Sequence, residues 1–164
     1  MSNFDMQIHI IAVGRVKESY LADGIAEYEK RLRPYVKIQI TEIVNERQPP
    51  HLTQTQQAQI LKKEGSRIIK AIPSLSYTIA LDINGKKKST EELAALLNKQ
   101  EIGGTNRISF IIGGDLGLSN DVLGQCNERL SLSPMTFTHQ MVRLILLEQI
   151  YRSFRILRGE PYHK

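Results

Sequence analysis

The chain has 164 residues, of which 41% are hydrophobic and 24% are charged, and its formal net charge is +5. This length suits one compact domain covering residues 1–164, and the composition excludes a disordered or repetitive protein. Its apolar runs are too short to span a bilayer and its start does not resemble a secretion signal, so we expect a cytoplasmic protein without a membrane partner.

The first half of the chain alternates strand and helix patterns. Residues 7–13 predict a buried strand, residues 20–33 an amphipathic helix, and residues 37–44 a second strand. A second helical pattern covers residues 53–72. We expect Gly65 to interrupt or soften this helix, because glycine is a poor helix former.

The alternation continues in the second half. Residues 77–83 predict a third strand that ends in an Asn84-Gly85 turn, and Ser89 with Glu92 forms a capping box that opens a helix. The remaining predicted elements are a strand at 107–112, a short helix capped by Ser119, a short strand at 130–133 and a long helix at 138–157. This order favours an α/β fold with a mainly parallel sheet and helices on both faces.

The long last helix carries apolar residues around most of its circumference. One core face cannot bury them all, so either neighbouring segments or a second subunit must cover the rest. In a domain of this size we favour a two-fold homodimer.

A glycine-rich turn, Gly113-Gly114-Asp115-Leu116-Gly117, follows the predicted fourth strand. Glycines at the carboxyl end of a buried strand let the backbone approach a ligand closely. The spacing differs from the dinucleotide-binding G-x-G-x-x-G, which follows the first strand of its unit, so a Rossmann-type site is disfavoured.

Three turns at the carboxyl ends of strands are expected to converge in a parallel sheet. They follow Leu81 and Ile112 and cover residues 132–137. Each alone reads as an ordinary loop, whereas their convergence favours a binding site at this edge.

Five motifs then resemble, in order, those of the bacterial ribosomal RNA large subunit methyltransferases that act on N3 of pseudouridine, a SPOUT family. They lie at residues 111–118, 130–133, 135–140, 148–152 and 158–164. The resemblance covers the full length and identifies the chain as a member of this family. It implies a homodimer with a carboxyl-terminal trefoil knot, S-adenosylmethionine as the methyl donor, and ribosomal RNA in the ribosome or its large subunit as the partner.

The resemblance also carries over the cofactor pocket of the family to the three turns. The residues are Leu81, Gly113, Leu132, Ser133, Pro134, Met135, Thr136 and Phe137. Methyl transfer mainly requires a nucleophilic nitrogen to be held in line with the methyl group, and N3 of pseudouridine must also lose a proton.

The basic end of the chain supplies the candidates for catalysis. The resemblance places Arg152, Tyr162 and His163 on the RNA side of the pocket, where His163 is a candidate to take the proton. For Arg152 or Arg155 taken alone, phosphate binding or a solvated helix face is the simpler interpretation. A non-catalytic RNA-binding module that uses this basic end is the alternative function.

Other polar residues have simpler interpretations. His139 reads as a helix-start histidine bonded to the local backbone, and Asp115 either meets the cofactor or points to solvent. Thr138 stands where the family usually has proline, and it is suited to cap the last helix. The lone Cys126 reads as a buried thiol, and the scattered histidines without cysteine support predict no metal site.

Overall fold

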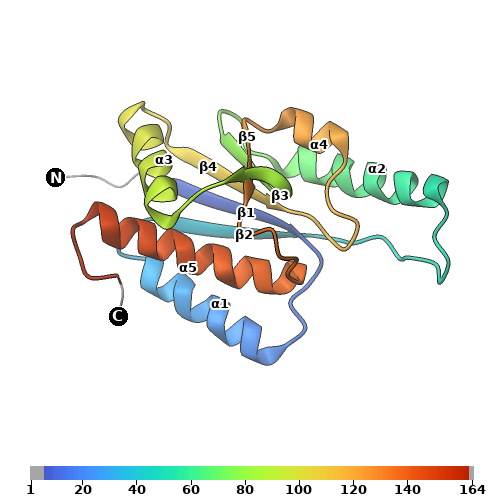
Figure 1. The fold of residues 1–164 in the computed structure, drawn as a ribbon, viewed down its shortest axis with the longest axis horizontal. Coiled ribbons are helices and arrows are strands. Elements are labelled where there is room, and N and C mark those ends of the chain that lie inside the picture. Colours follow the sequence, from blue (N-terminus) through green and yellow to red (C-terminus); the bar gives the residue numbers. More distant parts are fainter. Residues whose placement is uncertain (1–5, 163–164) are drawn as a thin grey trace.

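The computed structural model of the protein describes residues 6–162, in which strands and helices alternate along the chain (Figure 1). The strands are β1 (Gln7–Val13), β2 (Lys37–Ile43), β3 (Tyr77–Lys87), β4 (Arg107–Ile112) and β5 (Glu128–Ser131). The helices are α1 (Ser19–Leu32), α2 (Gln54–Ala71), α3 (Thr90–Ile102), α4 (Asn120–Gln125) and α5 (His139–Leu157). Each predicted element is present, and most boundaries differ from prediction by one or two residues.

The five strands form one sheet in the order β2-β1-β4-β3-β5, and every pair is parallel. The central strand β1 aligns Ile10 with Ile40 of β2 on one side and with Phe110 of β4 on the other. Because all strands run the same way, the segment after Leu81 in β3 and the turns that follow β4 and β5 share one edge of the sheet, as predicted.

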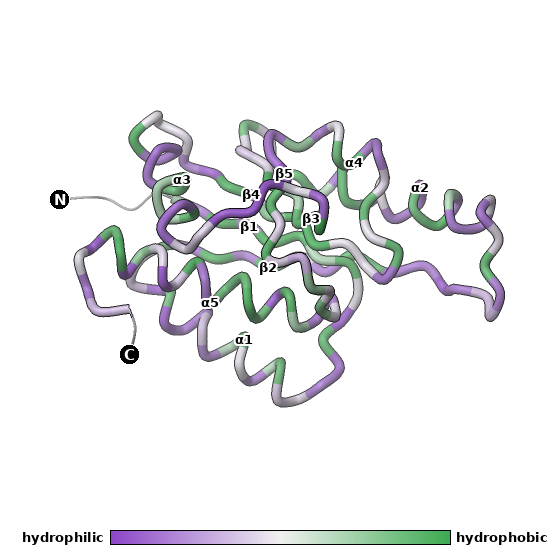
Figure 2. The backbone as a smooth tube through the Cα atoms, in the orientation of Figure 1, coloured by the Kyte–Doolittle hydropathy of each residue, from purple (hydrophilic) through white to green (hydrophobic). Residues whose placement is uncertain are grey.

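Helices cover both faces of this sheet, which confirms the predicted α/β class. The larger core joins α1, α3 and α5 to one face, with Ile8, Ile10 and Phe110 fully buried in it. The smaller core joins α2 and α4 to the other face through Ile11 and Ile111. Alternate residues of β1 and β4 thus point into opposite cores, and Figure 2 shows hydrophobic colour gathered in these central strands.

Helix α5 packs between α1 and α3, so neighbouring segments cover a large part of its circumference (Figure 1). Leu146, Ile150 and Phe154 are buried, whereas Leu144 and Tyr151 remain only partly buried. Within residues 6–162, no helix is long and apolar enough to cross a membrane.

The helix starts are capped as the sequence indicates. The Ser89 hydroxyl accepts from the backbone N–H of Glu92 at 3.1 Å, and the Glu92 carboxylate accepts from the Ser89 N–H at 3.0 Å. This backbone hydrogen bond from Ser89 lowers the pKa of Glu92. The Thr138 hydroxyl accepts from the Met141 N–H at 3.3 Å, so threonine caps α5, as predicted.

Two glycine predictions were wrong for the same physical reason. Helix α2 runs unbroken through Gly65, because the glycine is where α4 approaches: a Cβ there would lie 2.7 Å from Ser119 Oγ. Strand β3 does not end at a turn of Asn84 and Gly85 but resumes along β5 after a bulge. A Cβ on Gly85 would lie 2.7 Å from the Arg129 carbonyl carbon, so glycine permits this close strand contact.

A buried carboxylate, Glu64 of α2, ties down the loop between β2 and α2. Its side chain accepts from the backbone N–H of Glu46 at 2.8 Å. Arg67, one turn further along α2, contacts the Glu46 carboxylate and donates to the Val44 carbonyl at 2.9 Å. Burial raises the pKa of Glu64, because the charged form loses hydration.

We predict that Gly65→Ala lowers the thermal unfolding midpoint, although alanine is the better helix former. The new methyl group would press on Ser119 Oγ, which also caps α4 by accepting from the Val122 N–H. Overpacking of this kind costs about 1–3 kcal/mol. The control is Gly124→Ala in α4, where a Cβ meets nothing within 4 Å and stability should rise. If both variants were stabilised equally, the predicted clash between a methyl group at position 65 and Ser119 would be refuted.

We predict that Glu64→Gln raises the unfolding midpoint near pH 8. The folded pKa of Glu64 lies above its unfolded value, so folding is favoured by the protonated carboxyl and opposed by ionisation as the pH rises. Glutamine has no such ionisation, and its advantage over glutamate should shrink toward pH 4. Glu29→Gln, at a partly exposed position, is the control in the same calorimetric pH series. A midpoint lowered throughout this series would show that the ionised carboxylate stabilises the loop.

Candidate active site

A cavity of about 640 Å³ opens at the carboxyl edge of the sheet. Its walls come from the three segments that the sequence singles out, namely the β3 bulge after Leu81 and the turns that follow β4 and β5, with the first residues of α5 closing one side. The parallel sheet therefore brings together segments of which the first, at Leu81, and the last, at Leu132, lie about 50 residues apart in the chain.

The wall after β4 is a tight turn that contains three glycines, Gly113, Gly114 and Gly117. Gly113 lies so close to Gly117 that a Cβ on Gly113 would stand 2.6 Å from the Gly117 carbonyl oxygen. The turn closes through a hydrogen bond of 3.0 Å from the Gly117 N–H to the Gly114 carbonyl, and Gly117 has φ of +79°. Any side chain at Gly113 would force this turn open.

The bulge of β3 supplies the opposite wall. Leu81 and Lys86 both align with Leu130 of β5, so the four residues between them leave the ladder, and Asp82 and Ile83 line the cavity. Ile83 is 48% exposed and Met135 is 74% exposed, so hydrophobic side chains stand open at the rim.

Most of the predicted cofactor residues meet here. Those that line the cavity are Leu81, Gly113, Leu132, Ser133, Met135, Thr136 and Phe137. Pro134 is exposed and is not a lining residue, although it lies in the same turn. Sequence reasoning missed Ile83, because the bulge that exposes it depends on long-range pairing with β5. It also missed Val142 of α5, whose helical pattern predicts only core packing.

His139 lies at the junction of the cavity with β1. Its Nδ1 is 3.1 Å from Asp115 Oδ1, and Asp115 remains 70% exposed. The Nε2 side of the ring faces Gly14, where a Cβ would stand only 3.3 Å away. The histidine thus contacts a side chain of the glycine turn, where a bond to its local backbone was predicted, and it links the ends of β1 and β4 with α5.

Arg143 fixes the start of α5 to the same edge. Its side chain is 4% exposed and donates to Glu42 Oε2 at 2.8 Å and to the Gly14 carbonyl at 3.2 Å. Among residues 6–162 its Nε atom is buried without a hydrogen-bond partner. No local pattern indicates this role, because an arginine on an amphipathic helix is normally interpreted as a solvated residue.

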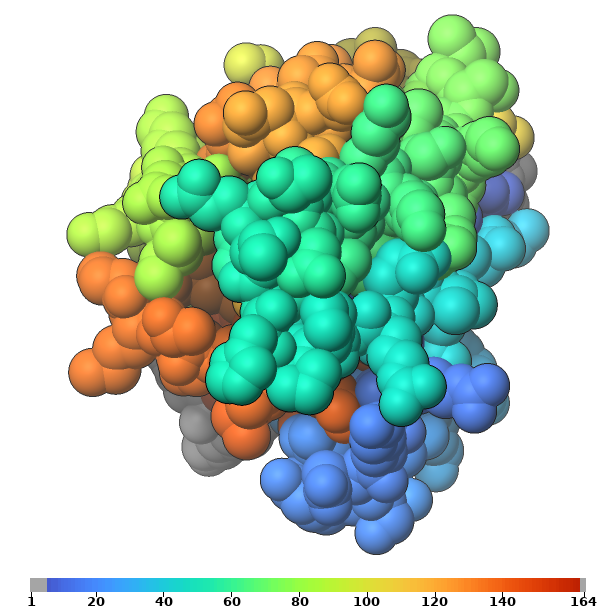
Figure 3. All heavy atoms as spheres, turned by 90° about the vertical axis from the view of Figure 1, so that its right-hand side faces the viewer, coloured from blue at the N-terminus to red at the C-terminus, as the bar shows by residue number. Residues whose placement is uncertain are grey.

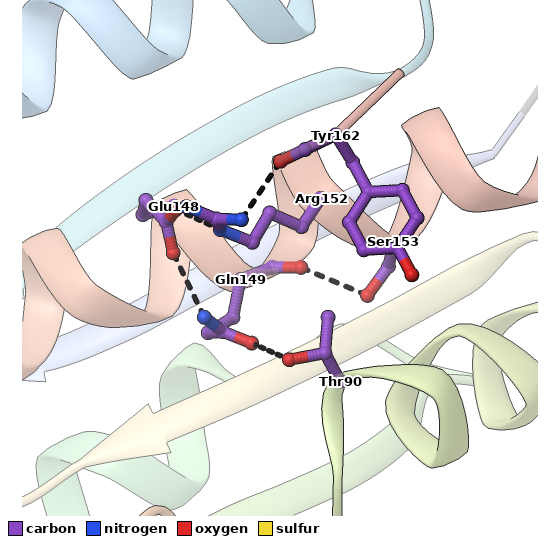
Figure 4. A network of polar contacts seen from close by, with 6 residues as sticks. All are labelled: Thr90, Glu148, Gln149, Arg152, Ser153 and Tyr162. Carbon is purple, nitrogen blue, oxygen red and sulfur yellow. Dashed lines mark hydrogen bonds and ion pairs between the residues drawn. The ribbon is translucent and has the colours of Figure 1, made fainter. Parts of the chain in front are cut away.

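Two of the predicted catalytic residues, Arg152 and Tyr162, belong to a separate polar network at the far end of α5 (Figure 4). Arg152 contacts the Glu148 carboxylate and donates to the Tyr162 carbonyl at 2.7 Å. Glu148 accepts from Gln149 at 2.8 Å, and Gln149 in turn accepts from Thr90 of α3 at 2.6 Å. His163 lies outside the described residues.

Arg155 holds the same tail from the next turn. It donates to the Pro161 carbonyl at 2.8 Å and pairs with Glu160, while the Tyr162 hydroxyl lies 3.4 Å from Glu91 Oε1. Neither arginine is a merely solvated side chain, because both anchor the backbone of residues 161–162.

The cavity residues and the Arg152 network lie apart in the chain that the structure describes. Arg152 follows His139 by 13 residues along α5, which at 1.5 Å per residue is about 20 Å. In Figure 1 the orange start of α5 lies at the cavity edge of the sheet and its red end at the opposite side.

Neither the cysteine nor a metal site adds to this chemistry in the described residues. Burial raises the pKa of Cys126 to about 11, and its thiol donates to the Val122 carbonyl, as suits a structural thiol. In the part of the chain that the structure describes, no three His, Cys, Asp or Glu side chains are grouped to hold a metal ion.

A second cavity, of about 760 Å³, lies at the amino edge of the sheet, beside Gln7, Lys37 and Arg107. It is larger, but none of its described lining residues is a glycine, and ligands of parallel sheets bind at the other edge. We therefore place the candidate site at the carboxyl edge.

Comparison with solved structures supports the fold. A crystal structure of a "probable methyltransferase" from Bordetella pertussis matches with a TM-score of 0.53 and 11% identity, covering 94% of this chain and 99% of that one. A methylase family protein from Haemophilus influenzae matches with a TM-score of 0.52 and 14% identity, covering 94% of this chain and 68% of the other.

Comparison of sequences is more specific. The family described as "Predicted SPOUT methyltransferase" matches residues 6–163. A ribosomal RNA large subunit methyltransferase H from Listeria monocytogenes is 52% identical, and one from Carboxydothermus hydrogenoformans is 50% identical. Each alignment covers 97% of this chain and 100% of the relative. The chain therefore belongs to the SPOUT methyltransferases, in the family of the ribosomal RNA large subunit methyltransferases H.

Proposed function

We propose that this protein transfers a methyl group from S-adenosylmethionine to N3 of a pseudouridine in the ribosomal RNA of the large subunit. The observation that carries the proposal is the glycine-walled cavity at the carboxyl edge of the sheet, in a chain about half identical to large subunit methyltransferases over 97% of its length.

The cavity fits this methyl donor. Its mixed lining offers apolar contact from Leu81 and Leu132 and polar groups from the Ser133 to Thr136 turn. Gly113 and Gly114 line the cavity with backbone, while the positions of their missing Cβ atoms face Gly117 and Val13, so glycine lets the turn pack closely and keep its backbone at the cavity wall. These segments, including Pro134 and Phe137, would hold the adenosine and methionine parts.

When bound there, S-adenosylmethionine supplies an electrophilic methyl group on a sulfonium. The protein must then align N3 of the base behind that methyl group and assist the loss of the N3 proton. Arg152 is suited to stabilise the developing negative charge on the base, Tyr162 to stack on the base or donate a hydrogen bond, and His163 to take the proton.

A homodimer reconciles these roles with the distances. Arg152 lies about 20 Å along α5 from the cavity of its own subunit. If α5 of two subunits ran antiparallel about a two-fold axis, the tail of each would reach the cavity of the other. The partly buried residues Leu144 and Tyr151 on α5 would contribute to such an interface.

In this proposal residues 1–164 act as a single SPOUT methyltransferase domain whose carboxyl-terminal segment forms a trefoil knot. The substrate is a ribosomal particle, so the protein works in the cytoplasm. No resident metal is required, because alignment and proton removal are sufficient for methyl transfer from a sulfonium.

We predict that the protein transfers labelled methyl groups to ribosomes from a strain that lacks the modification, at a single pseudouridine. Gly113→Ala should abolish transfer and weaken S-adenosylmethionine binding in calorimetry, because its methyl group opens the turn. Gly124→Ala, in α4 outside the cavity lining and with open space for a Cβ, is the control for substitution of glycine. Donor binding without transfer to ribosomes would indicate another substrate, and no donor binding would favour the non-catalytic RNA-binding module.

We predict that two inactive variants restore each other when co-expressed. Gly113→Ala damages the cavity and Arg152→Ala damages the tail, so a mixed dimer retains one intact composite site. Random pairing of equal amounts should recover about a quarter of wild-type transfer. Two cavity variants, Gly113→Ala with Phe137→Ala, form the control pair and should not rescue each other. If the first pair also stays inactive, the cavity and tail of one subunit must work together.

A further inference from the structure

We propose that the loop between β1 and α1 is a docking site for the ribosomal RNA strand that flanks the target nucleotide. Its cationic and aromatic side chains, Arg15, Lys17 and Tyr20, would bind phosphates and a base. This inference rests on the proposed function, and it adds an RNA-contacting surface at a part of the chain that the tail does not include.

The loop is held in place next to the cavity. Gly14 donates to the Ile43 carbonyl at 2.8 Å and accepts from the buried Arg143 at 3.2 Å. The backbone N–H of Lys17 donates to Gln140 Oε1 at 2.8 Å. Gln140 directly follows His139, which lines the cavity and packs against Gly14. These contacts fix the loop backbone to the first turn of α5.

The side chains of the loop alternate between core and solvent. Val16 packs against the main core, whereas Arg15 and Lys17 on either side of it are exposed. Within residues 6–162, the side chains of Arg15 and Lys17 form no hydrogen bond or ion pair, so both remain directed to solvent. A rigid backbone thus presents two positive charges outward, as phosphate binding requires.

The acidic groups nearest to the loop have partners of their own. Glu42 is paired with Arg143, and the Asp115 carboxylate lies beside His139, which offsets its charge only when the imidazole is protonated. Glu18 is exposed and leaves the loop with one net positive charge. Since the RNA backbone carries a charge on every nucleotide, two cations at the edge of the cavity favour its approach.

Tyr20 adds a surface for a base. It stands in the first turn of α1 with 64% of its surface exposed. A large aromatic side chain in this position is costly to leave in water, and aromatic rings beside cations are the usual platform for unpaired bases. Figure 3 shows that the blue loop and start of α1 reach the same face as the orange segment that leads into α5.

The topology explains why this loop serves the substrate and not the methyl donor. The cavity lies over β4, β3 and β5, whereas the loop continues from β1, the next strand of the sheet. If the base of the target nucleotide enters the cavity, the adjacent nucleotides of the RNA strand would lie along the carboxyl edge of the sheet, beside the loop.

The test measures methyl transfer by the full-length protein to ribosomes that lack the modification, over a range of salt concentrations. The double variant Arg15→Gln, Lys17→Gln should raise KM for ribosomes by about tenfold and change kcat far less. The slope of log KM against log salt should become shallower by about 1.4, which corresponds to two phosphate contacts on a single strand. The calorimetric affinity for S-adenosylmethionine should stay at the wild-type value.

The matched control is Lys62→Gln, Lys63→Gln, which removes two exposed cations from α2 outside the cavity lining. It should leave KM within about twofold of wild type. For the aromatic contact, Tyr20→Ala should raise KM. Tyr20→Phe should keep the wild-type KM, because phenylalanine can still stack on a base.

Three results would overturn the proposal. The first is an unchanged KM and salt slope in the Arg15, Lys17 double variant, and the second is an equal effect of the α2 control. The third is dissociation of the subunits by Tyr20→Ala in analytical ultracentrifugation, which would make the surface a subunit contact. Failure of the wild-type protein to modify ribosomes would instead refute the proposed function, so the two failures are distinct.

Discussion

The contact of Gly113 with Gly117 is the constraint on which the candidate site depends. A Cβ at Gly113 would lie 2.6 Å from the Gly117 carbonyl oxygen, so the chain can turn back on itself there only as bare backbone. This turn also places Asp115 beside His139, and His139 packs on Gly14. Through this sequence of contacts one tight turn determines how β1, β4 and α5 meet at the edge of the sheet.

Local patterns were sufficient to predict the elements and the position of the cavity. Apolar runs such as 107–112 indicate buried strands, and the hydroxyls of Ser89, Ser119 and Thr138 mark helix starts that the structure confirms. In an all-parallel sheet the carboxyl ends of strands share one edge, so the order of elements alone places the three turns together.

Features that depend on distant partners could not be predicted in this way. Gly65 reads as a weak point of its helix, because nothing local indicates that Ser119 of α4 will press against it. The β3 bulge at Gly85 depends on the backbone of β5, and the burial of Arg143 depends on Glu42, which lies 101 positions earlier. The family resemblance predicted that Arg152 and the cofactor residues belong to one site. In this chain the length of α5 lies between Arg152 and the cavity.

The way in which the tail is anchored bears on how its sequence can change. Arg152 and Arg155 donate to the main-chain carbonyls of Tyr162 and Pro161, which every amino acid possesses. The two arginines on α5 therefore hold the backbone of residues 161–162 whatever side chains these two residues carry, while the Glu160 carboxylate adds a side-chain anchor through Arg155 and Tyr35. A substitution of Tyr162 leaves the anchoring carbonyl in place, so the side chain at this position can vary while the Arg152 anchor is kept.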